Sequence, residues 1–176
     1  MTCRRPFVVL ASGVVLLIGT AAMGGYGGLR INTTPSEPLG LWRIVPLARP
    51  LARGDLVFVC PPWTPEFELA FARGYLRRGL CPGGVGPLIK SVAALPGQRI
   101  KVGADVRIDD ARLAGSALRA SDAAGRPLAP FAGGVVPAGR IFLHSSFAGS
   151  YDSRYFGPVP ADGVLGLAQP VLTLDP

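Results

Sequence analysis

The sequence contains few of the groups that bind metal ions. It has one histidine, His144, and three cysteines in 176 residues. A structural zinc site needs four Cys or His ligands at short, regular spacings, and these residues do not provide them. We therefore predict no metal site, and no part of the sequence indicates a cofactor.

Charge is also scarce, at 16% of the residues, and the net charge is +7. Only two of the eighteen basic residues are lysine, Lys90 and Lys101. The arginines are scattered and few aromatic side chains lie between them, which argues against a surface that binds nucleic acid. A basic surface of this kind is attracted to anionic membrane lipid instead.

One long segment has no charge at all. It runs from Pro6 to Leu29 and follows Arg4 and Arg5. Twenty-four residues in a helix span roughly 36 Å, which exceeds the roughly 30 Å of a bilayer core. The preceding arginines favour a cytoplasmic N-terminus, so the rest of the chain is expected on the outer side of the membrane.

This segment has two interpretations. Its most apolar stretch, residues 7–18, is short, and small residues follow at Thr20-Ala21-Ala22, as in a cleaved secretory signal. Alternatively the whole uncharged run is retained as an anchor, which we favour. We therefore divide the chain into a membrane anchor or signal segment, residues 1–29, and one exported domain, residues 30–176.

The cysteines divide between the two sides of this segment. Cys3 precedes it, whereas Cys60 and Cys81 lie in the exported part, where disulfides persist. A bridge between Cys60 and Cys81 would close a loop of about 22 residues and contribute about 3 kcal/mol to stability. The alternative is two free thiols.

Proline and glycine recur every few residues after the anchor and divide the domain into short strands. The pattern predicts a mainly β, antiparallel domain. We expect strands at Gly40–Val45, Asp55–Val59, Leu88–Leu95, Arg99–Val102, Val106–Ile108, Arg140–His144 and Gly163–Leu174.

A single helix is predicted within this β domain, from Pro65 to Arg78. Thr64 suits the N-cap, and Gly79 suits the stop. Acidic residues lie near the start and the arginines 73, 77 and 78 near the end, as the helix dipole favours. Because the helix lies between Cys60 and Cys81, a disulfide would join its two ends.

Lys90 is the first candidate for chemistry. On a strand, Leu88, Lys90 and Val92 would point to one face. Burial on an apolar face disfavours the ammonium form, which would bring the pKa of Lys90 from about 10.4 toward ~7–8, the range useful to a general base. A lysine at the margin of a sheet, extending to solvent, is the alternative.

Two further segments carry polar side chains in restricted backbone. Ser36 stands between Pro35 and Pro38, with Thr34 two residues earlier. Prolines at these positions limit the backbone around the serine hydroxyl. The second segment, residues 149–159, contains Ser150 and an Asp152–Arg154 pair that would fix the loop as an ion pair.

Together these segments resemble, in order, three boxes of the type I signal peptidase superfamily. Residues 34–40, Thr-Pro-Ser-x-Pro-x-Gly, resemble its nucleophile box. Residues 90–97, Lys-x-Val-x-x-Leu-Pro-Gly, resemble its general-base box, and residues 152–157 its last box. The Pro-Leu-Gly-Leu-Trp ending at residues 38–42 and the Cys-Pro pair at Cys81 resemble the conjugative-transfer branch, the TraF-type peptidases.

The resemblance implies an antiparallel signal-peptidase fold and a Ser-Lys mechanism without a cofactor. Ser36 would be the nucleophile and Lys90 the general base. The Thr34 hydroxyl and the Ser36 N–H would stabilise the oxyanion, and Ser150 would orient the lysine amine. Asp152 and Arg154 would be structural support.

The implied function is a membrane-bound serine endopeptidase in the bacterial inner membrane, single-pass, with its domain in the periplasm. Its substrate would be a pilin-like precursor cut after small residues, and its partners the conjugation or secretion machinery. Two alternatives remain: a Ser-His-Asp triad of Ser36, His144 and Asp152, and an inactive membrane-tethered assembly factor. Glu37, Gln98 and His144 depart from housekeeping signal peptidases and favour a specialised branch.

Overall fold

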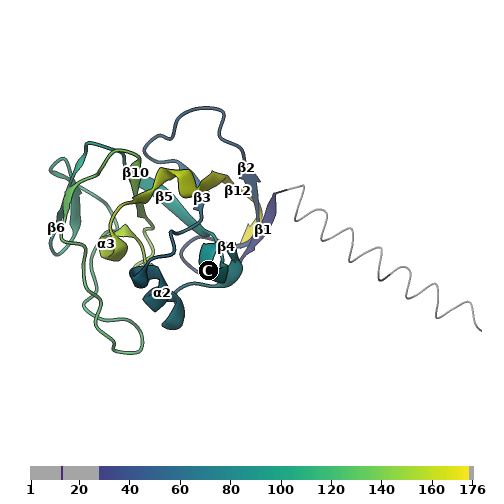
Figure 1. Cartoon of the computed structure of the whole chain (residues 1–176), viewed down its shortest axis with the longest axis horizontal. Coiled ribbons are helices and arrows are strands. Elements are labelled where there is room, and N and C mark those ends of the chain that lie inside the picture. The colour runs from purple at the N-terminus through teal and green to yellow at the C-terminus, as the bar shows by residue number, and fades with distance from the viewer. Residues whose placement is uncertain (1–12, 14–27, 175–176) are drawn as a thin grey trace, which may run out of the picture.

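The domain is built on two antiparallel sheets (Figure 1). The structure is a computed structural model, and it describes Gly13 and residues 28–174. The larger sheet has seven strands in the order β1 (Leu29–Asn32), β2 (Leu39–Val45), β12 (Val164–Leu174), β3 (Leu56–Val59), β5 (Leu88–Ala94), β10 (Arg140–His144) and β11 (Val159–Pro160). The smaller sheet has the order β8 (Ala111–Arg112), β7 (Val106–Ile108), β6 (Arg99–Val102) and β9 (Gly134–Val135).

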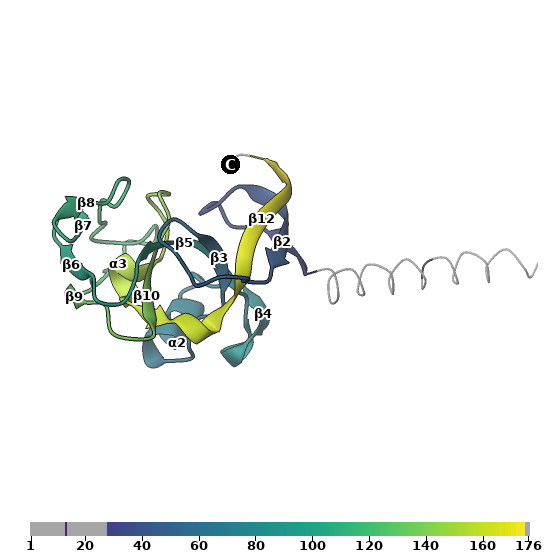
Figure 2. The ribbon, with the colours of Figure 1, turned by 90° about the horizontal axis from the view of Figure 1, so that it is seen from above.

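The predicted mainly β, antiparallel domain is confirmed, because the strands of both sheets pair in antiparallel register. The seven predicted strands are present, each with bounds within one residue of the prediction. The strands that the sequence did not indicate are short, from two to four residues: β1, β4 (Arg78–Cys81), β8, β9 and β11. Figure 2 shows the smaller sheet at the opposite end of the domain from β1 and β2.

The apolar side chains form three clusters, and β5 and β10 separate two of them. Ile141 and Leu143 of β10 pack into the main cluster, together with Val92 of β5. Phe142 points to the other side and packs into a second cluster beneath the smaller sheet. This alternation is what the strand geometry requires. The third cluster centres on Trp42 of β2 and Phe58 of β3.

The predicted helix is present but shorter than expected. α2 runs from Pro65 to Ala72, so the predicted end at Arg78 is wrong. Gly74, at φ +80°, turns the chain out of the helix, and Leu76 is then buried in the main cluster. The last turn of α2 therefore contains no basic residue. Thr64 occupies the N-cap, but its hydroxyl bonds to the Glu66 carboxylate and not to a backbone N–H.

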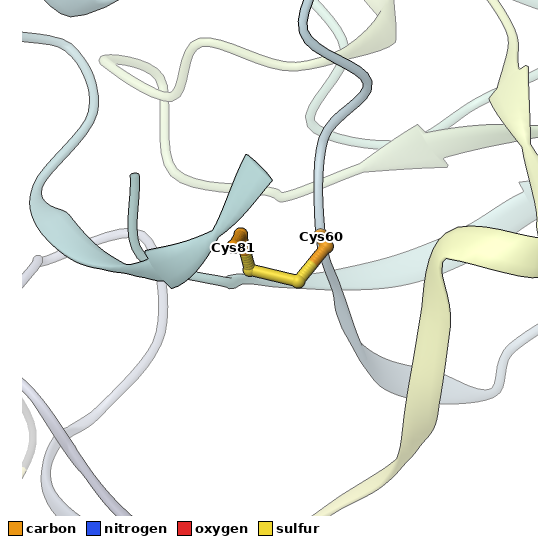
Figure 3. Close-up of a disulfide and its surroundings, with 2 residues drawn as sticks. All are labelled: Cys60 and Cys81. Atoms are coloured by element: carbon orange, nitrogen blue, oxygen red, sulfur yellow. A yellow bond between two sulfur atoms is a disulfide. The ribbon is translucent and has the colours of Figure 1, made fainter. Parts of the chain in front are cut away.

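The predicted bridge between Cys60 and Cys81 is formed (Figure 3). The two Cα atoms lie 5.4 Å apart, and the bridge closes residues 60–81 into what we call the disulfide loop. This loop contains α2 and β4 and is joined to the rest of the domain by Tyr75, whose hydroxyl donates to Asp122 Oδ2 at 2.5 Å. Arg73 and Arg126 add two hydrogen bonds to main-chain carbonyls across the same junction.

The predicted anchor or signal segment, residues 1–29, lies almost wholly outside the described residues. Within Gly13 and residues 28–174, no helix combines the length and the apolar character needed to span a bilayer. The division of the chain at residue 29 therefore stays a prediction.

Candidate active site

A cavity of about 510 Å³ lies against the beginning of β5. Its walls come from five segments: β1 with the turn that follows it, Phe58 of β3, the second half of the disulfide loop, the beginning of β5, and the loop after β10. Four of the predicted site residues line it: Thr34, Ser36, Lys90 and Ser150. The cavity thus brings together side chains that are separated by more than a hundred residues of sequence.

Asn32 holds the turn that carries Ser36. Its amide nitrogen Nδ2 donates to the main-chain carbonyls of Thr34, Glu37 and Pro38, at 2.9 to 3.0 Å. Its Oδ1 accepts from the Thr34 N–H and the Thr34 hydroxyl. One buried side chain therefore fixes the main chain on both sides of Ser36. The sequence analysis did not identify Asn32.

Thr34 has a different contact from the one predicted. Its hydroxyl donates to Asn32 Oδ1 at 2.7 Å. A hydroxyl has one proton to donate. To stabilise an oxyanion, as the family resemblance implies, the Thr34 hydroxyl would have to leave Asn32.

Lys90 lies on β5 with its side chain almost fully buried, at 3% exposure. Its neighbours alternate as predicted, since Leu88 and Val92 pack on the main cluster and Ile89 on the third. Burial lowers the pKa of the Lys90 amine from 10.5 to about 8, although the charges of Asp152 and Glu37 oppose the shift. Within residues 28–174 the amine makes no hydrogen bond or ion pair, and Lys90 lines the cavity.

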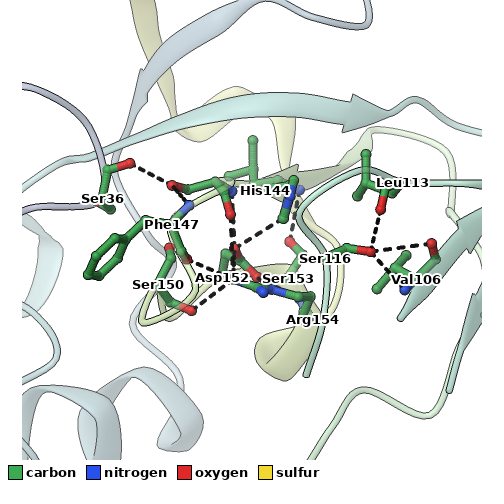
Figure 4. A network of polar contacts seen from close by, with 12 residues as sticks. Ser36, Val106, Leu113, Ser116, His144, Phe147, Ser150, Asp152, Ser153 and Arg154 are labelled. Atoms are coloured by element: carbon green, nitrogen blue, oxygen red, sulfur yellow. Dashed lines mark hydrogen bonds and ion pairs between the residues drawn. The ribbon is translucent and has the colours of Figure 1, made fainter. Parts of the chain in front are cut away.

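Ser36 and Lys90 share the cavity, but no hydrogen bond joins the Ser36 hydroxyl to the Lys90 amine among the described contacts. Catalytic hydrogen bonds are often long in a free enzyme and shorten when substrate binds. The Ser36 carbonyl accepts a hydrogen bond from the Ser145 hydroxyl at 2.5 Å, which links the Ser36 turn to the loop after β10. Figure 4 shows this contact.

Ser150 is buried at 4% exposure, and its hydroxyl has no hydrogen-bond partner among the described residues. A buried hydroxyl without a partner costs about 1–3 kcal/mol. Because Ser150 lines the same cavity as Lys90, its hydroxyl is available to the lysine amine or to a bound substrate.

Asp152 and Arg154 form the predicted ion pair behind the cavity wall, with Arg154 Nε 2.8 Å from Asp152 Oδ1. Both side chains are fully buried, and neither lines the cavity. Arg154 Nη2 also donates to the Ser150 carbonyl at 3.2 Å, and its Nη1 to the Ala117 carbonyl at 2.8 Å. In Figure 4 the pair lies beside Ser150, and its hydrogen bonds fix the loop that carries Ser150.

His144 is buried between two oxygen atoms. Its Nε2 lies 3.2 Å from the Ala114 carbonyl, and its Nδ1 lies 3.3 Å from Asp152 Oδ2, outside good hydrogen-bond geometry. Burial raises the pKa of the Asp152 carboxyl, but the His144 contact and the hydrogen bonds from Arg154 outweigh it and hold the pKa below its usual range. His144 is not among the described residues that line the cavity, so this geometry does not favour a triad with Ser36.

We expect Asn32 to be a positioning residue. Asn32→Ala removes its hydrogen bonds, so the Ser36 turn should loosen, and we expect kcat to fall about 10–100-fold because Ser36, the predicted nucleophile, would be misplaced. Asn32→Asp retains the acceptor and loses the three donor contacts, and should show most of this loss. Steady-state kinetics, with the melting temperature measured in parallel, tests this. A folded Asn32→Ala variant with kcat within twofold of the parent protein would contradict it.

Comparison with known proteins agrees with this geometry. The model of the family described as signal peptidase, peptidase S26, matches residues 4–173. The chain is 61% identical to the conjugal transfer protein TraF of Agrobacterium fabrum (strain C58 / ATCC 33970) over the full length of both chains. It is 36% identical to a plasmid transfer protein TraF of Escherichia coli, over 95% of this chain and 94% of the relative.

Among solved structures, a signal peptidase I from Enterococcus faecalis V583 aligns with 68% of this chain and 97% of its own, with a TM-score of 0.40 and 19% identity. The family assignment rests on the match over residues 4–173 and on the full-length relatives. The chain belongs to the S26 signal peptidase family, in its TraF-type branch.

Proposed function

We propose that the protein is a membrane-bound serine endopeptidase in which Ser36 is the nucleophile and Lys90 the general base. The observation that carries this proposal is a buried lysine amine without a partner in the described residues, with its pKa lowered to about 8, in the same cavity as a serine hydroxyl. A lysine amine that is neutral near physiological pH can accept a proton from serine.

In the proposed reaction, Ser36 Oγ attacks the scissile carbonyl and its proton passes to Lys90 Nζ. The carbon–nitrogen bond of the tetrahedral intermediate then breaks, and Lys90 transfers the proton to the departing amine. An acyl ester on Ser36 remains. Water, deprotonated by the neutral Lys90, attacks this ester and releases the acid, which restores the Ser36 hydroxyl.

The oxyanion requires hydrogen-bond donors near Ser36. The Ser36 N–H makes no hydrogen bond to another described residue, so it is available for this role. The Thr34 hydroxyl is the second proposed donor, and it must rotate away from Asn32 to act. Ser150 would then accept a hydrogen bond from Lys90 and orient the amine.

The proposed substrate is a pilin-like precursor cut after small residues, and the proposed partners are components of the conjugation machinery. Support comes from the relatives, whose names describe proteins of conjugal or plasmid transfer. The disulfide loop also supports an exported domain, because disulfides persist in the periplasm and rarely in the cytosol.

We further propose that the domain lies against the outer surface of the inner membrane, held by a single-pass anchor. Ile31, Leu41 and Leu172 are cross-strand partners in β1, β2 and β12, so they share one face of the sheet. Ile31 is 75% exposed, Leu172 73% and Leu174 75%. This apolar face follows directly after the uncharged segment that ends at Leu29, which favours lipid as its partner.

A fluorophore that reports polarity tests this orientation in the full-length chain, in a Cys3→Ser background. The fluorophore is attached at Leu172→Cys, and its emission is compared between the chain in lipid vesicles and the chain held in an amphipathic polymer after the detergent is removed. The emission should lie at shorter wavelength in the vesicles. Attached at Val135→Cys on the smaller sheet, which is 49% exposed, it should not shift. Equal spectra at both sites in vesicles would contradict the proposed orientation.

The pH dependence of kcat/KM tests the proposed reaction. Since only the neutral amine can act as a base, the rate should rise with pH through an apparent pKa near 8, the pKa of Lys90. The negative charge of Glu37 raises this pKa, so Glu37→Gln should move the rise to lower pH. Glu68→Gln, on the exposed side of α2, is the matched control. A profile that is flat between pH 6 and about pH 9 would contradict a lysine base.

A further inference from the structure

The charged residues that line the cavity with Ser36 are all basic. Besides Lys90, three arginines line it: Arg30, Arg77 and Arg78. The chain has eleven carboxylate residues, and none is among the described residues that line this cavity. A cleft lined by charges of one sign focuses the field and raises the local concentration of oppositely charged groups.

Arg77 and Arg78, which we call the arginine pair, extend from the disulfide loop and are exposed. Arg78 lies with its guanidinium 5.6 Å from the centre of the Phe71 ring. Neither side chain of the pair has an ion-pair partner in residues 28–174, whereas Arg49, Arg112, Arg126 and Arg154 each pair with an aspartate. The arginine pair is therefore not neutralised within the described part of the chain.

The arginine pair does not serve to tune the general base. The groups that shift the pKa of Lys90 are burial, Asp152, Glu37 and Arg154. The arginine pair is not among these causes, and its charge is therefore available to a group that enters the cavity. Arginine stays charged at every pH at which the enzyme would act, and its fork matches a carboxylate.

We infer that the arginine pair binds a carboxylate of the peptide substrate and selects precursors that carry negative charge close to the scissile bond. The inference rests on the proposed function, because it assigns the substrate chemistry of the same cavity. The carboxylate is either an acidic side chain or the C-terminus of a substrate cut near its end. Both present two oxygens to a guanidinium.

The test measures binding separately from cleavage. Full-length Ser36→Ala protein in detergent is titrated with fluorescein-labelled Ala- and Gly-rich dodecapeptides, each with Glu, Gln or Lys at one position and with a free or amidated C-terminus. We expect the Kd of the Glu peptide to be about three- to tenfold lower than that of the Gln peptide, or the Kd of the free-acid peptide to be lower than that of the amide by the same factor. The difference should be smaller at high salt. Which of the two comparisons shows the effect identifies the source of the carboxylate.

Variants then assign the preference to the arginine pair. Arg77→Gln with Arg78→Gln should remove it, and Arg77→Glu with Arg78→Glu should make Lys the preferred residue. Arg99→Gln, an exposed arginine on β6 that does not line the cavity, should leave it unchanged. Equal Kd values for Glu, Gln and amide peptides, or a preference that survives Arg77→Gln with Arg78→Gln, would overturn the inference.

Two further measurements separate carboxylate binding from lipid binding and from cleavage. Binding of the protein to vesicles that contain phosphatidylglycerol is measured in parallel. If the double Gln variant loses vesicle binding while its peptide preference is unchanged, the arginine pair binds lipid and the inference is wrong. Cleavage by the unmodified chain is followed by mass spectrometry with the same peptides. Carboxylate-selective binding without Ser36-dependent cleavage would overturn the proposed function and leave the inferred binding site standing.

Discussion

Ser36→Ala is expected to abolish cleavage of the precursor, with a loss of at least about a thousandfold in kcat, because the proposed acyl ester forms on the Ser36 hydroxyl. Ser36 is only partly buried, and the contact that its turn makes with the Ser145 hydroxyl uses the main-chain carbonyl. The variant should therefore fold as the parent protein does. The measurement is single-turnover cleavage of a purified pilin-like precursor in detergent, with the products identified by mass spectrometry.

Ser146→Ala is the matched control, since Ser146 is exposed on the loop after β10 and does not line the cavity. It should retain the activity of the parent protein. If Ser36→Ala and the parent protein cleave the precursor equally, Ser36 is not the nucleophile. If neither cleaves any precursor of the conjugation apparatus, the alternative of an inactive assembly factor gains support.

Lys90→Met should have two opposite effects, a loss of activity similar to that of Ser36→Ala and a gain in stability. The folded protein lowers the pKa of this amine from 10.5 to about 8, so between these values the unfolded chain binds more protons than the folded one. Stability therefore increases with pH over this window. Below pH 8 the full cost of burying the amine is present, about 3 kcal/mol, and methionine removes that cost.

Urea denaturation of the full-length chain at pH 7 and at pH 10.5 measures this difference. Lys90→Met should raise the free energy of unfolding by about 2–3 kcal/mol at pH 7, and the gain should shrink toward pH 10.5. Lys101→Met is the control, because Lys101 is exposed on β6 and pairs with Asp110 at the surface, where its effect should stay within about 0.5 kcal/mol. A destabilised or fully active Lys90→Met variant would be inconsistent with a buried general base.

The fold was largely predictable because local sequence patterns indicate its longer strands. Each predicted strand combines apolar or β-branched residues with a nearby glycine or proline. The strand bounds predicted from this pattern agree with those of the structure. β1 was missed because Leu29 was assigned to the uncharged segment, and β4 because Arg78 was assigned to the helix. The end of α2 was wrong because Gly74, and not Gly79, adopts the left-handed backbone that lets Leu76 enter the core.

The candidate site was predictable where residue type is informative. Lys90 stood out because lysine is rare in this chain, and a rare charged residue within an apolar strand requires an explanation. Asn32 gave no such signal, since an asparagine next to a turn is common and its contacts depend on the path of the main chain. The sequence analysis assigned the arginine pair to the end of a helix. Its place at the cavity depends instead on the pairing of β4 with Val85, which the local sequence does not indicate.

The bridge between Cys60 and Cys81 has a consequence for when the proposed enzyme becomes competent. The wall that carries the arginine pair is closed at its two ends by this bond, so a newly made chain with reduced thiols lacks the covalent closure of that wall. The bond can form only after the thiols reach an oxidising compartment. For the exported peptidase proposed above, completion of the cavity would coincide with arrival in the compartment that holds exported precursors, and proteins still inside the cell would be spared.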